Sequence, residues 1–405
     1  MDIVLARRME VVRASDIREL LKLTSRPSVI SFAGGLPAAE LFPAAKIAEA
    51  ARRVLIEHGA RALQYSTTEG HPPLRAFVAE RMNRLWGTGY ANDEVMITTG
   101  SQQALDLTGK LLLDDGDEVL CESPTYLGAI SAWNVFRPRW VEVPTDDDGM
   151  DPTALEQLLD RCRRPKLVYV VPNFQNPSGR TWSFARRRRL ADIAKRRGVP
   201  VVEDNPYGEV RFEGEHLPAI ASLPEAGTVI SLGTFSKVFC PGMRLAWVAA
   251  ERNLLAKLTI LKQGADLHTS TLDQMILAEY LASHDLDADI RRVASAYRER
   301  RHAMIRALER EMPEGARFSR PQGGLFLWVE LPEAVDTRAL LADALQHEVA
   351  FVPGDSFFPS RGGRNAMRLN FSAMPPDRIE EGIHRLGGMV REALARAHDE
   401  TLVVA

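Results

Sequence analysis

Between about residue 95 and residue 250, short apolar strands alternate with helical segments, and this alternation restricts the fold more than any other feature. The expected strands are Val95–Thr99, Glu118–Cys121, Leu167–Val171, Val199–Asp204, Thr228–Leu232 and Leu245–Ala249. Strands that are apolar on both faces and separated by helices need cover on both sides. The pattern therefore predicts a mostly parallel α/β sheet with helices packed on each face, of seven strands in all, six of which are these runs.

The pattern of apolar and polar residues changes after about residue 290. A long charged helix is followed by a glycine-rich strand over Gly323–Val329, and the chain closes with a helix that carries Ile379, Ile383, Leu386 and Val390 on one face. This mixture of separate helices and strands predicts a smaller α+β domain.

The length of 405 residues exceeds what one hydrophobic core usually fills, so we expect two domains. Residues 1–52 are expected to form a lid helix, over Ser15–Leu23, and part of the small domain. Residues 53–289 are expected to form the large domain, and residues 290–405 the small C-terminal domain.

The overall charge predicts neither nucleic acid nor a membrane surface as a partner, because 51 basic and 54 acidic residues leave a net charge of −3. Cys121, Cys162 and Cys240 are widely spaced and have no clustered histidines nearby, which argues against disulfides and against a bound metal. Residues 1–8 lack the apolar core of a signal peptide, and no later stretch has the apolar length of a membrane span. We expect a cytoplasmic protein.

The run of four arginines at 186–189 resembles a basic patch for nucleic acid. It opens a segment with Leu190, Ile193 and Ala194 at helical spacing, which indicates a solvated helix face instead.

The loop around Lys237 carries the strongest chemical signal in the sequence. Hydroxyl groups at Thr234 and Ser236 come just before this lysine, and Arg244 follows it. A lysine amine whose ammonium form is destabilised attacks a carbonyl, whereas hydroxyls and a guanidinium bind phosphate. The loop therefore predicts a site for pyridoxal 5'-phosphate (PLP), with Lys237 as its Schiff-base partner; a surface lysine is the plainer alternative.

Other polar residues follow the expected strands, where ligands of open parallel sheets bind. Gly100, Ser101 and Gln102 open a helix, whose N-terminus attracts phosphate, although an ordinary helix cap would have the same sequence. Tyr126 can stack on a planar cofactor or belong to the core. Asn176 lies in an Asn-Pro turn that can direct its amide toward a phenolic oxygen.

Two charged residues complete this group. Asp204 ends a strand, and a buried carboxylate there would keep the ring nitrogen of PLP protonated, although an acid at a strand end can also be a helix cap. Arg368 lies within an apolar strand, where its guanidinium needs a carboxylate from either a substrate or a structural ion pair.

Taken in order, these motifs resemble the fold type I PLP-dependent aminotransferases of class I and II, over nearly the whole chain. The segments 31–37, 63–70, 263–269 and 351–354 are similar to the branch that contains 2-aminoadipate aminotransferase and enzymes for aromatic and branched-chain amino acids. The resemblance implies an aspartate aminotransferase-like fold and a ping-pong transfer of an amino group from an L-α-amino acid to a 2-oxo acid such as 2-oxoglutarate.

The resemblance also implies a role for each site residue. Lys237, Asp204, Tyr207 and Asn176 would be catalytic, with Tyr207 and Asn176 at the phenolic oxygen. The residues implied at the cofactor are Tyr65, Gly100, Ser101, Gln102, Tyr126, Asn176, Asp204, Tyr207, Thr234, Ser236, Lys237 and Arg244. The residues implied at the substrate are Arg18, Gly35, Asn176 and Arg368.

Within the family the residue at Tyr65 reaches the neighbouring subunit's phosphate, which implies a homodimer with shared sites. Arg18 matches a reader of the substrate's side-chain carboxylate, although it can equally be a solvated helix arginine. Another PLP reaction on the same scaffold, such as β-elimination, decarboxylation or racemisation, remains an alternative, as does a ligand-sensing module.

Overall fold

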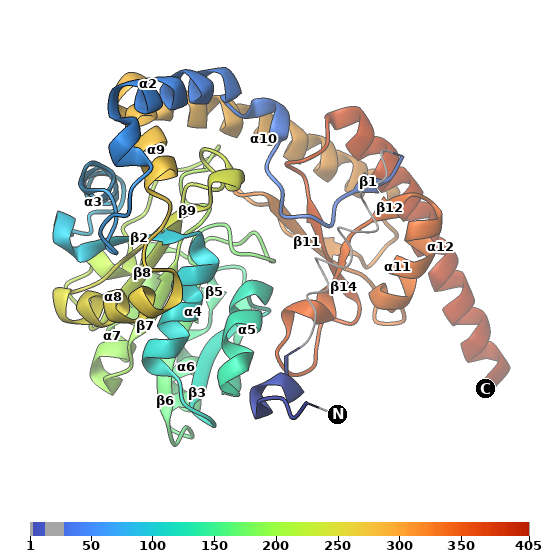
Figure 1. Ribbon diagram of the computed structural model, residues 1–405. Coiled ribbons are helices and arrows are strands. Elements are labelled where there is room, and N and C mark those ends of the chain that lie inside the picture. Colours follow the sequence, from blue (N-terminus) through green and yellow to red (C-terminus); the bar gives the residue numbers. More distant parts are fainter. Residues whose placement is uncertain (1–2, 13–27, 405) are drawn as a thin grey trace.

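A large α/β domain and a smaller domain lie side by side, and in Figure 1 the long helix α10 runs along the top from one to the other, whereas α2 lies above the large domain. The structure is a computed structural model that describes residues 3–12 and 28–404. The expected lid helix at residues 15–23 lies outside these residues.

The α-helices are α2 (Ala44–Ala62), α3 (Pro72–Trp86), α4 (Ser101–Leu112), α5 (Leu127–Trp133), α6 (Pro152–Leu159), α7 (Phe184–Arg197), α8 (Arg252–Asp266), α9 (Thr271–Ser283), α10 (Leu286–Glu311), α11 (Thr337–Gln346) and α12 (Pro376–Val404). Short 3-10 turns are η1 (Arg7–Glu10), η2 (Ala39–Leu41), η3 (Asn92–Glu94), η4 (Asn134–Phe136), η5 (Ile220–Ser222), η6 (Pro241–Met243) and η7 (Gly354–Phe357).

The large sheet has the order β2-β9-β8-β7-β6-β3-β4-β5. Its strands are β2 (Val95–Thr99), β3 (Glu118–Ser123), β4 (Arg139–Asp146), β5 (Gly149–Met150), β6 (Pro165–Val170), β7 (Val201–Asp204), β8 (Val229–Thr234) and β9 (Leu245–Ala249). The five strands from β8 to β4 are mutually parallel, whereas β9 is antiparallel to both neighbours. The mostly parallel sheet predicted from the sequence is confirmed, with β5 as a short eighth strand.

Each face of the sheet has its own hydrophobic core, because successive side chains of a strand point to opposite faces. Leu120, Val168 and Val201 pack under α6 and α7. Val119 and Val202 belong to the core formed with α3, α4, α5 and α8. The two covered faces explain why these strands read as continuous apolar runs.

The smaller domain contains an antiparallel sheet of order β10-β11-β14-β13. Its strands are β10 (Arg317–Phe318), β11 (Phe326–Glu330), β13 (Val352–Pro353) and β14 (Ala366–Asn370). Helix α12 packs against α10 and α11, and the four apolar residues expected on its inner face are fully buried. Near the start of the chain, β1 (Ile30–Ser31) pairs in parallel with β12 (Val349–Ala350), so the segment before α2 joins this part of the molecule.

Two details differ from the sequence-based expectation. Strand β4 was missed because half of its residues are polar and only Val143 is fully buried, next to the short edge strand β5. The arginine run does begin a helix, which Ser183 caps by accepting a hydrogen bond from the backbone of Arg186. However, Arg187 in that run is completely buried, so the interpretation of the whole run as a solvated face is wrong at this residue.

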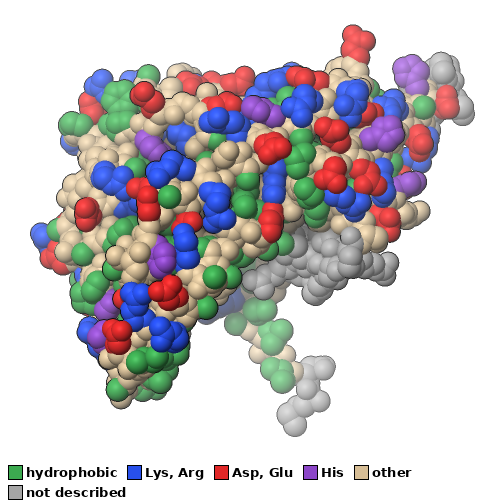
Figure 2. Space-filling view, turned by 90° about the horizontal axis from the view of Figure 1, so that it is seen from above, with side chains coloured by type: hydrophobic (Ala, Val, Ile, Leu, Met, Phe, Trp, Pro, Cys, Tyr) green, Lys and Arg blue, Asp and Glu red, His purple; other side chains and the backbone are tan. Residues whose placement is uncertain are grey.

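The face seen in Figure 2 carries basic and acidic side chains in close alternation. No helix within residues 3–12 and 28–404 has the length and apolar character needed to cross a membrane.

Candidate active site

A cavity of about 230 Å³ opens at the carboxyl ends of the parallel strands, between the large sheet and strand β11. It brings together residues that are far apart in the sequence. The lining residues are Gly35, Ser101, Gln102, Tyr126, Val171, Asn176, Asp204, Pro206, Tyr207, Thr234, Ser236, Lys237, Pro241, Arg244, Phe326 and Arg368. Of the site residues expected from the sequence, all but three line this cavity: Gly100 lies beside it, and Tyr65 and Arg18 are discussed below.

Lys237 follows strand β8, and its Nζ donates a hydrogen bond of 2.9 Å to the carbonyl oxygen of Gly35. Burial lowers the pKa of the Lys237 ammonium to about 8, and the positive charges of Arg368 and Arg244 act in the same direction. A larger fraction of this amine is therefore neutral near pH 7 than for an ordinary lysine, and the neutral amine is the nucleophilic form.

Asp204 ends strand β7 and is almost completely buried. Its Oδ2 accepts a hydrogen bond of 2.8 Å from the Tyr169 hydroxyl, whereas its Oδ1 has no partner among the described residues. Burial raises the pKa of Asp204 to about 7, and the Tyr169 hydrogen bond opposes this rise. A buried acceptor without a partner is costly, so Asp204 is suited to meet a cationic N–H group of a ligand.

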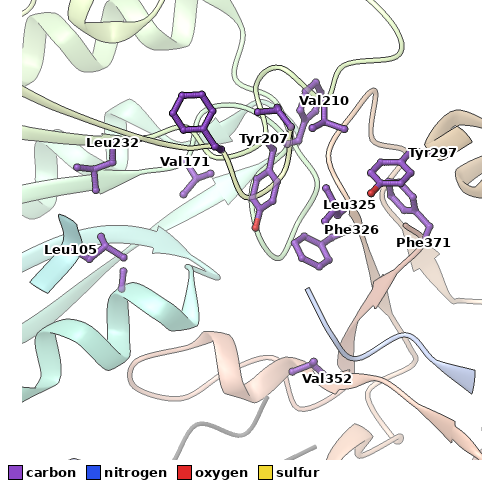
Figure 3. Close-up of a cluster of buried hydrophobic side chains, with 14 of the residues drawn as sticks. Leu105, Val171, Tyr207, Val210, Leu232, Tyr297, Leu325, Phe326, Val352 and Phe371 are labelled. Carbon is purple, nitrogen blue, oxygen red and sulfur yellow. The ribbon is translucent and has the colours of Figure 1, made fainter. Parts of the chain in front are cut away.

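Asn176 connects two other cavity residues. Its Nδ2 lies 3.4 Å from the Tyr207 hydroxyl oxygen, and its Oδ1 accepts a hydrogen bond of 2.9 Å from Arg368 Nη1. Phe326 packs against both partners, with its ring centre 4.1 Å from the Arg368 guanidinium carbon and 5.7 Å from the Tyr207 ring centre. Figure 3 shows Tyr207 and Phe326 side by side between the two domains.

The Arg368 guanidinium is held but not neutralised. Besides Asn176, it donates to the carbonyl oxygen of Ala33, whereas its Nε has no partner among the described residues. Burial lowers the pKa of Arg368 to about 10. A buried cation without a carboxylate partner is unfavourable unless a ligand supplies one, so the structural ion pair considered from the sequence is not present within the described chain.

A set of donors suited to phosphate gathers where the N-terminus of α4 meets Arg244. Helix α4 begins at Ser101, directly after Gly100, which has a φ of +77°. A Cβ atom at Gly100 would collide with the Arg244 guanidinium, so glycine leaves room for this arginine at the helix N-terminus. The hydroxyl of Thr234 lies 3.0 Å from that of Ser236, which brings further donors to the same region.

Tyr126 directly precedes α5 and lines the cavity. A Cβ at Gly128 would overlap the Tyr126 ring, so this glycine permits the ring's position. Tyr126 therefore lies where its ring could stack on a planar ligand in the cavity.

Two expected site residues are not part of this cavity. Tyr65 is 78% exposed and makes an edge-on ring contact with His268, at 5.8 Å between centres. Arg18 lies outside the described residues. The structure of one chain therefore tests neither of the roles expected for them.

Several cavity residues were not singled out from the sequence. Val171 and Pro206 each lie one or two residues beyond the end of a strand, so the rule that ligands bind at strand ends would have found them. Phe326 follows the glycine pair of the expected strand, but nothing local indicates that its ring covers an arginine. Tyr169 lies in an apolar strand, and nothing in the sequence around it distinguishes it from its neighbours. Only the hydrogen bond to Asp204 in the folded structure does so.

The residues present fit PLP. The unpartnered Asp204 oxygen suits its protonated ring nitrogen, the cradle of Gly100 and Arg244 suits its phosphate, and Lys237 suits its aldehyde. Together with a mostly parallel sheet and a smaller antiparallel domain, these features define a fold type I PLP-dependent enzyme.

Comparisons with known proteins agree with this class. The family model described as aminotransferase class I and II matches residues 27–386. The 2-aminoadipate transaminase of Thermus thermophilus is 49% identical over 95% of this chain and 96% of its own, and the aromatic-amino-acid aminotransferase 1 of Thermococcus litoralis is 45% identical over 95% and 93%. The solved α-aminoadipate aminotransferase of Thermus thermophilus, complexed with N-(5'-phosphopyridoxyl)-L-leucine, superimposes with a TM-score of 0.90 at 46% identity, covering 96% of this chain and 98% of that one.

The chain belongs to the class I and II aminotransferases. It is a PLP-dependent aminotransferase, with an amino acid and a 2-oxo acid as its substrates. The resemblance noted from the sequence is confirmed, and none of the similarities reported above supports the alternatives of another PLP reaction or a sensing module.

Proposed function

We propose that this aminotransferase moves the amino group of an L-α-amino acid of the 2-aminoadipate, branched-chain or aromatic type to 2-oxoglutarate. The names of the similar enzymes support the aromatic and 2-aminoadipate types, and the leucine adduct in the solved Thermus thermophilus structure supports the branched-chain type. The observation that carries the proposal is the convergence of Lys237, Asp204 and Arg368 on one cavity, which provides a nucleophile, a counter-ion and a carboxylate reader.

PLP, when bound, supplies an aldehyde that takes up the amino group and a ring that accepts electrons from the substrate's Cα. In our proposal, Gly100, Ser101, Gln102, Thr234, Ser236 and Arg244 hold the phosphate. Tyr126 stacks on the ring, Asp204 keeps the ring nitrogen protonated, and Asn176 and Tyr207 donate to the phenolic oxygen.

Lys237 has two tasks in this proposal. Its amine would hold the cofactor's aldehyde carbon, and once the substrate has freed it, the amine would take the proton from the substrate's Cα and hold it for return. The 2.9 Å hydrogen bond to Gly35 keeps the amine inside the cavity. With the 2-oxo acid bound as the second substrate, Lys237 would carry out the same proton transfers in reverse.

Arg368 binds the α-carboxylate of the substrate in this scheme. Its Nη1 bond to Asn176 and its stacking on Phe326 limit the motion of the guanidinium before the substrate arrives. Such restraint reduces the ordering cost of binding and fixes the Cα near Lys237.

We further propose a homodimer with shared active sites, in the cytoplasm. Tyr65 is a large aromatic residue left mostly exposed, and Leu63 and Leu267 nearby are also exposed. A partner subunit that covers this region would bury them and would receive Tyr65 at its own phosphate site.

The test is a screen of amino donors with 2-oxoglutarate, which follows both glutamate formation and the cofactor's absorbance. Consumption of 2-oxoglutarate with 2-aminoadipate, leucine or aromatic amino acids supports the proposal. The Lys237→Ala variant should remain folded by circular dichroism and lose turnover. Transamination by that variant at a near-normal rate, or loss of amino acid without use of 2-oxoglutarate, would contradict it.

A further inference from the structure

Arg187 on helix α7 is the most unusual buried residue outside the cavity. Its side chain is completely buried, and no described acidic residue forms an ion pair with it. A guanidinium loses much hydration free energy in such a place, and burial lowers the pKa of Arg187 to about 10, although the negative charge of the more distant Glu203 acts in the opposite direction. A helix that only needed to fill this space would be served as well by an apolar side chain.

Neutral oxygen atoms from several segments satisfy this guanidinium instead. Its Nη2 donates to Asn173 Oδ1 at 2.7 Å and to the Pro172 carbonyl at 3.0 Å. Its Nη1 donates to the Pro218 carbonyl at 3.0 Å, and its Nε to the Trp182 carbonyl at 3.3 Å. The planar guanidinium thus joins both ends of the loop 172–182 to the segment that contains Pro218.

The loop that Arg187 holds is the one that carries Asn176. Besides the guanidinium, a backbone bond of 2.9 Å from Trp182 N to the Pro172 carbonyl closes this loop. The position of Asn176 is therefore coupled to the two loop ends that Arg187 fixes.

A second connection leads from Arg187 to Tyr207. The Asn173 amide, whose oxygen accepts from Arg187, donates through Nδ2 to Asn205 Oδ1 at 3.0 Å. The same Asn205 oxygen accepts the backbone N–H of Gly208 at 3.1 Å, so it bridges the turn that contains Tyr207. One guanidinium thus supports both loops whose side chains meet at 3.4 Å in the cavity.

We propose that Arg187 is a positioning residue that sets the relative placement of Asn176 and Tyr207 through Asn173 and Asn205. This inference rests on the proposed function, in which those two side chains donate to the phenolic oxygen of PLP. Lysine cannot replace the arginine, because its single ammonium has no planar fork to span the four oxygens.

The decisive measurement is the pH midpoint of the bound cofactor's absorbance change. Donors at the phenolic oxygen stabilise its anion, so their displacement should move this midpoint to higher pH. We expect Arg187→Lys to raise the midpoint by about half a unit or more and to lower kcat/KM for the amino donor by about tenfold or more.

The matched control is Arg188→Lys, one residue along the same helix. Arg188 is about half exposed and pairs with Glu225 at the surface, so its variant should change neither quantity. If Arg187→Lys lowers only the melting temperature and leaves the midpoint and kcat/KM as in the wild type, the inference is wrong and Arg187 only supports the fold.

Two further variants separate the possible failures. Asn205→Ala keeps every bond of Arg187 but breaks its connection to the Tyr207 turn, so it should also raise the midpoint, even if Arg187→Lys fails to fold. An unchanged midpoint in Asn205→Ala would overturn the proposed connection between Arg187 and the Tyr207 turn.

Tyr207→Phe tests the proposed role of Tyr207 at the phenolic oxygen. An unchanged midpoint in this variant would contradict that role itself, whatever the other variants do.

Discussion

The hydroxyl of Tyr169 donates a hydrogen bond of 2.8 Å to Asp204 Oδ2 from the neighbouring strand of the large sheet. The other carboxylate oxygen of Asp204 has no partner among the described residues. Because burial favours the protonated carboxyl, this single phenol is what helps the carboxylate to stay ionised. Tyr169 therefore supports the proposed counter-ion from outside the cavity.

Tyr169→Phe removes that support and should raise the pKa of Asp204 further. We expect kcat/KM to fall by about ten- to a hundredfold, the scale of a lost hydrogen bond to a charged group. Tyr280→Phe is a suitable control, since Tyr280 is equally buried and bonds to Asp289 away from the cavity. Equal losses in both variants, measured by steady-state kinetics, would mean that only general stability had changed.

Asp204→Ala tests the counter-ion itself. Without a carboxylate the ring nitrogen of the cofactor is no longer held protonated, and we expect the rate to fall by roughly two orders of magnitude or more. The rate should be measured at saturating substrate, together with the PLP content by absorbance. A variant that binds PLP and turns over at the wild-type rate would exclude this role for Asp204.

The pKa of Lys237, lowered to about 8, predicts how the apo protein takes up PLP. Only the neutral amine attacks the aldehyde, so the rate of PLP uptake should rise with pH and level off above about 8. Arg368→Leu removes one of the positive charges that lower this pKa, so its midpoint should move to higher pH. Stopped-flow absorbance measures both curves, and a rate independent of pH would contradict the expectation.

The shared site can be tested by mixing two inactive variants, Lys237→Ala and Tyr65→Ala. If Tyr65 serves the partner subunit, one of the two sites in each mixed dimer has both residues intact. Random reassociation should then restore about a quarter of the wild-type activity. An active monomer at assay concentration, measured by light scattering, would rule out the shared site.

Substrate choice can be tested at Arg18, although this residue lies outside the described part of the chain. If its guanidinium reads a distal carboxylate, Arg18→Ala should raise KM for 2-aminoadipate and glutamate by about tenfold or more and leave leucine and aromatic donors nearly unchanged. Equal increases for acidic and apolar donors would indicate that Arg18 supports the helix instead.

The sequence by itself determined the elements and the residues that follow them. The apolar runs that end at Thr99 and Asp204 are strands, and Gly100 directly precedes a helix, because burial on two faces and the conformational freedom of glycine leave a local pattern. The group around Lys237 was recognisable for a similar reason, since its hydroxyls and its arginine lie within a few residues of it.

Only the tertiary structure decided which distant residues support that site. Tyr169 and Asp204 are 35 positions apart, and Phe326 covers Arg368 from another strand. The arginine run illustrates the limit most clearly, because four identical side chains differ only in the face of the helix they occupy. Arg187 faces the loops that carry the site, whereas Arg188 faces solvent. Helical spacing already places Arg187 on the apolar face of Leu190 and Ala194, but only the packing of α7 decides which oxygen atoms receive its guanidinium.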